Sequence, residues 1–147
     1  MSKQIDLRFG ALPWEPADNA ELIEVYDRHD RPITGLLRQH DQAYVFDCLE
    51  GHAWDVNIWI YAPVDDELVE RLAEAEGADF RKALDHALTR CDITAALAVG
   101  DRLEMTVIVP RKDLTRDLYV GVMHAVVTKV ESGPQTVLPL KNLQMAM

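Results

Sequence analysis

Four short apolar runs follow one another in the first half of the chain, and they constrain the fold more than any other feature. They cover residues 22–27 (LIEVYD), 33–39 (ITGLLRQ), 43–49 (AYVFDCL) and 54–62 (WDVNIWIYA). The connectors between them are short, polar segments such as RHDRP, QHDQ and EGHA. Runs of this length, separated by turn-forming residues, are typical of an antiparallel meander. The sequence therefore predicts four strands that pair in chain order.

Two amphipathic helices are predicted after the fourth run. The first covers residues 64–77, with Asp65 or Asp66 as its N-cap and Gly77 at its end. The second covers residues 79–90, and its apolar side chains recur at the i, i+3, i+4, i+7 spacing of one helical face. These side chains are Phe80, Ala83, Leu84, Ala87 and Leu88. Both helices therefore have one face suited to packing on the sheet.

The remaining segments are assigned less directly. Residues 93–101 (ITAALAVGD) fit a short helix or an apolar loop, whereas 102–110 alternate as a strand that ends at Pro110. Within 113–131 the valines favour a strand, which we predict, although every helical face of this segment is apolar as well.

No linker divides the chain, so residues 1–147 are expected to form a single globular domain. An irregular N-terminal arm (1–20) and an apolar C-terminal extension (132–147) flank its centre. The predicted fold class is α+β: an antiparallel sheet of five or six strands with two amphipathic helices packed on one face.

The composition excludes several classes of protein. With 15 Lys and Arg against 25 Asp and Glu, the formal net charge is −10, which disfavours direct binding to nucleic acid. No apolar run is long enough to cross a bilayer, and the N-terminus lacks the apolar core of a secretory signal. We therefore expect a cytoplasmic protein that does not bind membranes, and Cys48 and Cys91 suit a reducing compartment.

Four stretches within residues 22–88 occur in the order LIEVYDRHDRP, WIYAPV, ELVERL and ADFRKAL. This arrangement resembles a family of small uncharacterised bacterial α+β proteins that share LIEVYDxxDxP and WxYxPV patterns. The chain departs from the family where WIYAPV is followed by DDE instead of a serine cap, and where ADF replaces IDL. The resemblance implies a compact domain and no particular reaction.

Common catalytic motifs are missing from the sequence. Ser2 and Ser132 are the only serines, and no Gly-x-Ser-x-Gly segment occurs. The seven glycines are scattered, and none opens a helix after a strand as a phosphate-binding loop requires. We therefore predict no catalytic residues of these types and no cofactor.

One set of residues has the donor types of a tetrahedral zinc site, in the spacings Cys-x3-His and His-x4-Cys. Its members are Cys48, His52, His86 and Cys91. Cys48 falls in a predicted strand and His86 on the outer side of a predicted helix, so the set is poorly placed to converge. The preferred interpretation is two buried thiols and two surface imidazoles, without a metal.

Three further histidines are candidate ligands or proton-transfer groups. The pairs His29-Asp30 and His40-Asp41 fall in predicted hairpin turns, where an aspartate commonly bonds its own backbone. His124 lies within an apolar run, which favours a buried, hydrogen-bonded side chain over a ligand.

Strand alternation divides residues 54–62 into two faces. One face is apolar and is expected to pack against the helices: Trp54, Val56, Ile58, Ile60 and Ala62. The other combines polar and aromatic groups, as binding surfaces do: Asp55, Asn57, Trp59 and Tyr61. Two interpretations stay open for this second face. It is either a binding surface or a floor covered by the N-terminal arm, with Trp14 lying on it.

Acidic residues are concentrated on the two predicted helices. Residues 64–92 contain nine Asp or Glu against four Lys or Arg. The acidic side chains proposed to meet a partner are Asp65, Asp66, Glu67, Glu70, Glu74 and Glu76. The apolar C-terminal extension, 132–147, either docks on its own domain or joins a second copy in a homodimer.

These features lead to three functional hypotheses. The first is a non-enzymatic protein-binding module, similar to an immunity or inhibitor protein, whose acidic helices meet a basic partner. The second is a small-molecule-binding domain or enzyme that uses the sheet face around Asp55, Asn57, Trp59 and Tyr61. The third is a domain stabilised by zinc.

Overall fold

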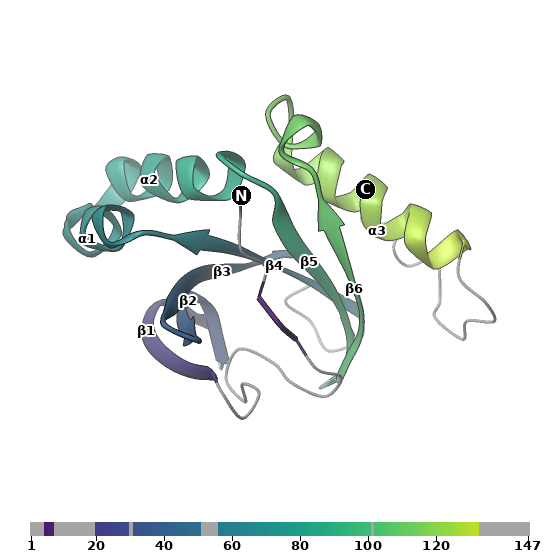
Figure 1. Ribbon diagram of the computed structural model, residues 1–147, viewed down its shortest axis with the longest axis horizontal. Coiled ribbons are helices and arrows are strands. Elements are labelled where there is room, and N and C mark those ends of the chain that lie inside the picture. Colours follow the sequence, from purple (N-terminus) through teal and green to yellow (C-terminus); the bar gives the residue numbers. More distant parts are fainter. Residues whose placement is uncertain (1–4, 8–19, 30, 51–55, 101, 133–147) are drawn as a thin grey trace.

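A computed structural model describes residues 5–7, 20–29, 31–50, 56–100 and 102–132 (Figure 1). Within these ranges the strands are β1 (Ala20–His29), β2 (Arg31–Gln39), β3 (Gln42–Glu50), β4 (Val56–Val64), β5 (Ile93–Val99) and β6 (Arg102–Val109). The helices are α1 (Asp66–Glu74), α2 (Gly77–Thr89), the short 3-10 helix η1 (Arg111–Asp113) and α3 (Leu118–Ser132).

The six strands form one antiparallel sheet in the order β1-β2-β3-β4-β5-β6. The α+β class and the antiparallel meander predicted from the sequence are therefore confirmed. The connection from β2 to β3 consists of His40 and Asp41, which have positive φ angles of 52° and 64°. Two consecutive positive φ values are the signature of the two-residue type I′ hairpin turn, whose twist matches that of the strands.

The predictions for two segments are wrong. The segment 93–101, predicted as a short helix or apolar loop, contains strand β5 (Ile93–Val99), which lies between β4 and β6 in the sheet. Residues 118–132, predicted as a strand, form α3. Its buried residues Val122, Met123, Val126 and Val130 recur at helical spacing. They join a core cluster that also contains residues of β5 and β6, so packing against those strands overrides the strand preference of valine.

All three α-helices cover the same face of the sheet (Figure 1). On α1, Asp65 is the N-cap, and its side chain accepts a hydrogen bond of 2.9 Å from the backbone N–H of Leu68. The helix ends at Glu74, and Gly77 is the first residue of α2 instead of the end of α1 as predicted. The predicted apolar stripe of α2 is confirmed, because four of its five members are buried and Phe80 is half-buried.

The opposite face of the sheet has its own apolar cluster, which is built largely from aromatic residues of β3 and β4. The N-terminal segment 5–7 lies on this side (Figure 1) and contributes the buried Ile5. Gln39, which is 2% exposed, fixes the segment in place. Its amide oxygen accepts from the backbone N–H of Asp6 at 2.8 Å, and its amide nitrogen donates to the Asp6 carbonyl at 2.9 Å.

Some expectations concern residues outside the described ranges. They include most of the predicted arm with Trp14, and the C-terminal extension beyond Ser132 with the homodimer assigned to it. Among the described helices, none combines the length and apolar character needed to span a bilayer.

Candidate functional site

The polar and aromatic face of β4 is interior. Asn57, Trp59 and Tyr61 are 3%, 1% and 1% exposed, and Asp55 lies outside the described residues. The rings of Trp59 and Tyr61 each lie 6.3 Å from the ring of Phe46, centroid to centroid. The expectation that these three residues form an accessible binding surface is therefore wrong. They form a floor, and the part of the arm that covers it in the described chain is residues 5–7.

Burial has a chemical consequence at Tyr61. Loss of hydration, and secondarily the nearby Cys48, raise the pKa of its phenol above the ordinary value. Its hydroxyl and the Nδ2 atom of Asn57 are buried without a hydrogen-bond partner among the described residues. A buried neutral phenol with no route to solvent is a packing group, and it offers no surface to a ligand.

The candidate zinc residues do not come together. Cys48 belongs to the cluster on the sheet face opposite the helices, whereas His86 is exposed on α2. Cys91 is half-buried beyond the end of α2, and His52 lies outside the described residues. Among the described residues, no group of three or more His, Cys, Asp or Glu side chains is arranged to hold a metal ion.

The other candidate histidines are also placed by the structure. His40 and Asp41 occupy the β2–β3 turn as predicted. His29 ends β1, and Asp30 lies outside the described residues. The prediction for His124 is wrong: the side chain is exposed on α3, because the helix directs it away from the face that packs on the sheet.

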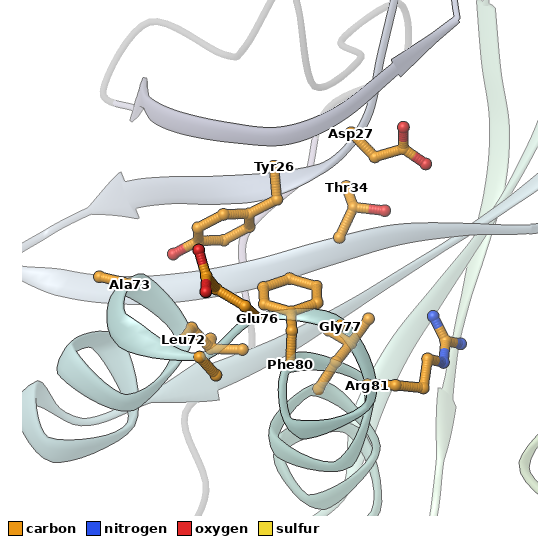
Figure 2. A pocket seen from close by; sticks show the side chains of 11 residues that line it. Tyr26, Asp27, Thr34, Leu72, Ala73, Glu76, Gly77, Phe80 and Arg81 are labelled. Carbon is orange, nitrogen blue, oxygen red and sulfur yellow. The ribbon is translucent and has the colours of Figure 1, made fainter.

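A cleft of about 530 Å³ opens between strands β1 and β2 and the corner where α1 meets α2 (Figure 2). One wall is apolar and comes from the helices, through Leu72, Phe80 and Leu84. The polar lining comes from β1, β2, the α1–α2 connection and α2: Asp27, Thr34, Glu76 and Arg81. The volume lies within the range of small-ligand sites, and a few polar groups in an apolar wall are their usual composition.

An aromatic pair stands at the centre of the cleft. The rings of Tyr26 on β1 and Phe80 on α2 are 5.1 Å apart between centroids and inclined by 59° (Figure 2). The Tyr26 hydroxyl oxygen is buried and has no hydrogen-bond partner among the described residues. Burial, and secondarily the charge of Glu24, raise the pKa of Tyr26 to about 12. The phenol is therefore neutral at physiological pH and able both to donate and to accept a hydrogen bond.

On the strand side, the lining of the cleft is stabilised by a buried hydrogen bond between two side chains. The hydroxyl of Thr34 on β2 donates to Oδ1 of Asp47 on β3 at 2.6 Å, and both side chains are buried. Asp47 lies opposite Thr34 in the β2–β3 register. A short hydrogen bond between adjacent strands fixes the position of Thr34, so this part of the lining is rigid.

The acidic residues proposed from the sequence are exposed on α1 and at the α1–α2 corner. Glu67 pairs with Arg71 at 3.6 Å, and both side chains are exposed, where such pairs contribute little. Glu70, Glu74 and Glu76 make no ion pair within the described part of the chain. Because Glu76 also lines the cleft, the acidic surface and the cleft are continuous.

Comparison with known proteins gave no match: no protein-family model, no curated protein and no solved structure is significantly similar to the chain. The site therefore has to be interpreted from its own chemistry. The sequence did not point to Tyr26 or Thr34, which fall in ordinary strand runs, and it assigned Phe80 to the core. These residues come together through long-range packing, and a local sequence motif would not have revealed them.

Proposed function

We propose that the protein is a binding module that recognises a basic partner protein through the acidic surface of α1 and the adjoining cleft. One observation carries the proposal: within the described chain, the half-buried Tyr26–Phe80 pair has a hydroxyl without a hydrogen-bond partner and lies beside exposed carboxylates that make no ion pair. A cluster of acidic residues alone would be explained by solubility. The aromatic cleft next to it adds a place for a ligand group to be held.

The cleft suits a lysine or arginine side chain. The aliphatic part of this ligand side chain would pack on Leu72 and Phe80, while its cationic end would face an aromatic ring and the carboxylate of Glu76. The Tyr26 hydroxyl oxygen would accept a hydrogen bond from that cation and so gain the partner that it lacks. Arg81, the cationic residue of the lining, forms an ion pair with Asp85 on the same helix, α2, at 3.6 Å.

The charge distribution supports the same partner chemistry. An apolar centre surrounded by charged residues is the usual anatomy of a protein interface, with aromatic anchors supplying most of the affinity. The surrounding carboxylates act at longer range, because they attract a partner of opposite charge and accelerate its association. In this arrangement, Glu70 and Glu74 would raise the association rate, whereas Tyr26 and Phe80 would slow dissociation.

The test compares two triple variants that carry the same change of charge. The first neutralises Glu70, Glu74 and Glu76 by substitution with glutamine. The second neutralises three exposed carboxylates elsewhere: Glu21, Glu104 and Glu131. Association with immobilised lysine-rich and arginine-rich peptides is measured by surface plasmon resonance at low and high salt. We expect the first variant to associate roughly tenfold more slowly than the wild type at low salt, with little difference at high salt.

The control triple variant distinguishes the effect of the carboxylates near the cleft from the effect of the net charge of the protein. It should associate much faster than the first variant, because its remaining carboxylates still surround the cleft. Equal rates for the two variants would mean that only the net charge matters, and would contradict the proposal. Equally strong binding of acidic and basic peptides by the wild type would contradict it too.

A small molecule is the second candidate ligand of the same cleft, and the rigid Thr34–Asp47 pair beneath it favours this alternative. The two candidates differ in their dependence on Glu70 and Glu74, which do not line the cleft. A small amine would bind equally well to the wild type and to the Glu70→Gln, Glu74→Gln double variant. A partner protein would bind the double variant more slowly.

A further inference from the structure

A second hollow lies on the far side of the helical layer, between η1 and the first two turns of α3. Its volume is about 490 Å³. The charged and titratable groups that line it are Lys112, Asp113, Arg116, Asp117 and His124. The sequence is unusual here for so acidic a protein, since residues 110–132 contain four Lys or Arg against three Asp or Glu.

Close packing of the backbone builds this hollow. A Cβ atom added to Gly121 would lie only 2.0 Å from the carbonyl oxygen of Asp113, so α3 rests directly on η1. A larger residue at position 121 would push the two elements apart. The contact therefore fixes the positions of Lys112 on η1 and of His124 on α3, which line the same hollow.

The hollow is lined by two cationic side chains, Lys112 and Arg116, and by two carboxylates that are not ion-paired with them in the described chain. Lys112, Arg116 and His124 make no ion pair within the described ranges, although Asp113 and Asp117 line the hollow with them. Asp117 has another role, because its Oδ1 atom accepts a hydrogen bond of 3.0 Å from the backbone N–H of Val120 and caps α3. Its negative charge thereby stabilises the start of the helix.

We propose that this hollow binds a phosphate monoester, with Arg116, Lys112 and His124 as its hydrogen-bond donors. A guanidinium and an ammonium are the groups that proteins commonly use for phosphate, the first through two parallel hydrogen bonds and the second as a point charge. The adjacent Val120 is 54% exposed and offers an apolar contact for the organic part of the ester. The negative charge of α1 and α2 is attenuated beyond about 8 Å at physiological salt, so it has little influence on more distant groups.

This site is independent of the proposed partner surface. Figure 1 shows α3 and η1 over the β5–β6 end of the sheet, whereas α1 and α2 cover the end nearer β1–β4. A ligand in one hollow does not contact the lining of the other, since the two share no residue.

The experiment titrates the full chain with phenyl phosphate and follows backbone amide shifts by NMR at constant ionic strength. We expect saturable shifts at residues 112–124, with a dissociation constant on the order of 1 mM. Arg116→Gln and Lys112→Gln should each weaken binding about tenfold or more, as the loss of a hydrogen bond to a charged group implies. The matched controls are Arg102→Gln and Lys82→Gln, which remove exposed cations outside the hollow and should leave the affinity unchanged.

Two further measurements make the outcome decisive. Benzoate carries the same ring with a carboxylate, so equal affinity for benzoate and phenyl phosphate would overturn the phosphate assignment. Arg116→Lys keeps the charge but loses the planar fork, and it should fall between the wild type and Arg116→Gln. Shifts that do not saturate, or that stay the same in the Lys112→Gln, Arg116→Gln double variant, would also overturn the proposal.

Discussion

Replacement of Tyr26 by phenylalanine tests the central feature of the cleft. The substitution keeps the ring that packs on Phe80 and removes a buried hydroxyl that has no hydrogen-bond partner among the described residues. A buried polar group without a hydrogen bond costs about 1–3 kcal/mol. Tyr26 is only partly buried as a residue, so the lower end of this range applies. We expect Tyr26→Phe to raise the free energy of unfolding by about 1 kcal/mol.

Thermal and urea denaturation followed by circular dichroism measure this change. For a chain of 147 residues, an unfolding entropy of about 2.1 cal/mol/K per residue converts 1 kcal/mol into a rise in Tm of about 3 °C. Tyr61→Phe is the matched positive control, because the Tyr61 hydroxyl is also buried without a partner but lies on the opposite face of the sheet. Tyr44→Phe should give no gain, since the hydroxyl of Tyr44 is not among these unpartnered groups.

The same variant should lose function while it gains stability. If the hydroxyl accepts a hydrogen bond from a basic ligand, its removal weakens binding of lysine-rich peptides by about 1 kcal/mol, or roughly fivefold. Tyr61→Phe should bind as the wild type does. A loss of stability in Tyr26→Phe would show that the hydroxyl has a partner in the free protein, and the reasoning would then fail. A gain in stability with unchanged binding would mean that the hydroxyl does not contribute to binding, although it is still a buried group without a partner in the free protein.

Three further predictions concern the scaffold. Gly35→Ala should destabilise the fold by about 2 kcal/mol or more, because the added Cβ atom would lie 2.3 Å from a carbonyl oxygen of β1. At Gly77 an added Cβ atom meets open space, so Gly77→Ala should cost only about 1 kcal/mol, which arises from the positive φ angle. Urea denaturation of the two variants measures this difference. Gln39→Leu removes both hydrogen bonds to Asp6 and should cost about 1–3 kcal/mol, with increased hydrogen exchange at residues 5–7. The pKa of Tyr26 rises from 10.0 to about 12 on folding, so ionisation of the phenol favours the unfolded state. The unfolding free energy should therefore be unaffected by this group below pH 10 and should fall between pH 10 and 12, less steeply in Tyr26→Phe.

The sequence predicted the strands and helices whose apolar pattern has a single interpretation. Strands β1 to β4 and helix α2 belong to this group, because turn residues or a clear helical period mark them. β5 was missed because Ile93–Val99 is apolar throughout and rich in alanine. Its odd and even positions are buried on opposite faces, so the polar–apolar alternation of a half-exposed strand is absent. The valines of α3 led to the wrong prediction of a strand for a related reason. The strand preference of valine depends on its tertiary packing, which the local sequence does not reveal.

The candidate site was less predictable than the fold. Trp59 and Tyr61 looked like a binding surface because strand alternation separates two faces without revealing what covers each one. The face that carries Trp59 and Tyr61 is covered by residues 5–7 and by the curved sheet itself, and this covering depends on long-range contacts (Figure 1). The cleft has the same origin, because Tyr26 and Phe80 are distant in sequence and meet where β1 passes the α1–α2 corner (Figure 2). By contrast, the exposure of Glu70 and Glu74 followed directly from the helical period.

The distribution of charge over the helical layer links the two proposed sites. Residues 64–92 contain nine Asp or Glu against four Lys or Arg, whereas residues 110–132 contain four Lys or Arg against three Asp or Glu. If both proposals hold, the two ends of one sheet face bind ligands of opposite charge. Because the sites share no lining residue, their ligands should not compete. Phenyl phosphate at constant ionic strength should leave the affinity for a lysine-rich peptide unchanged, and displacement of the peptide would mean that the two ligands meet at one site.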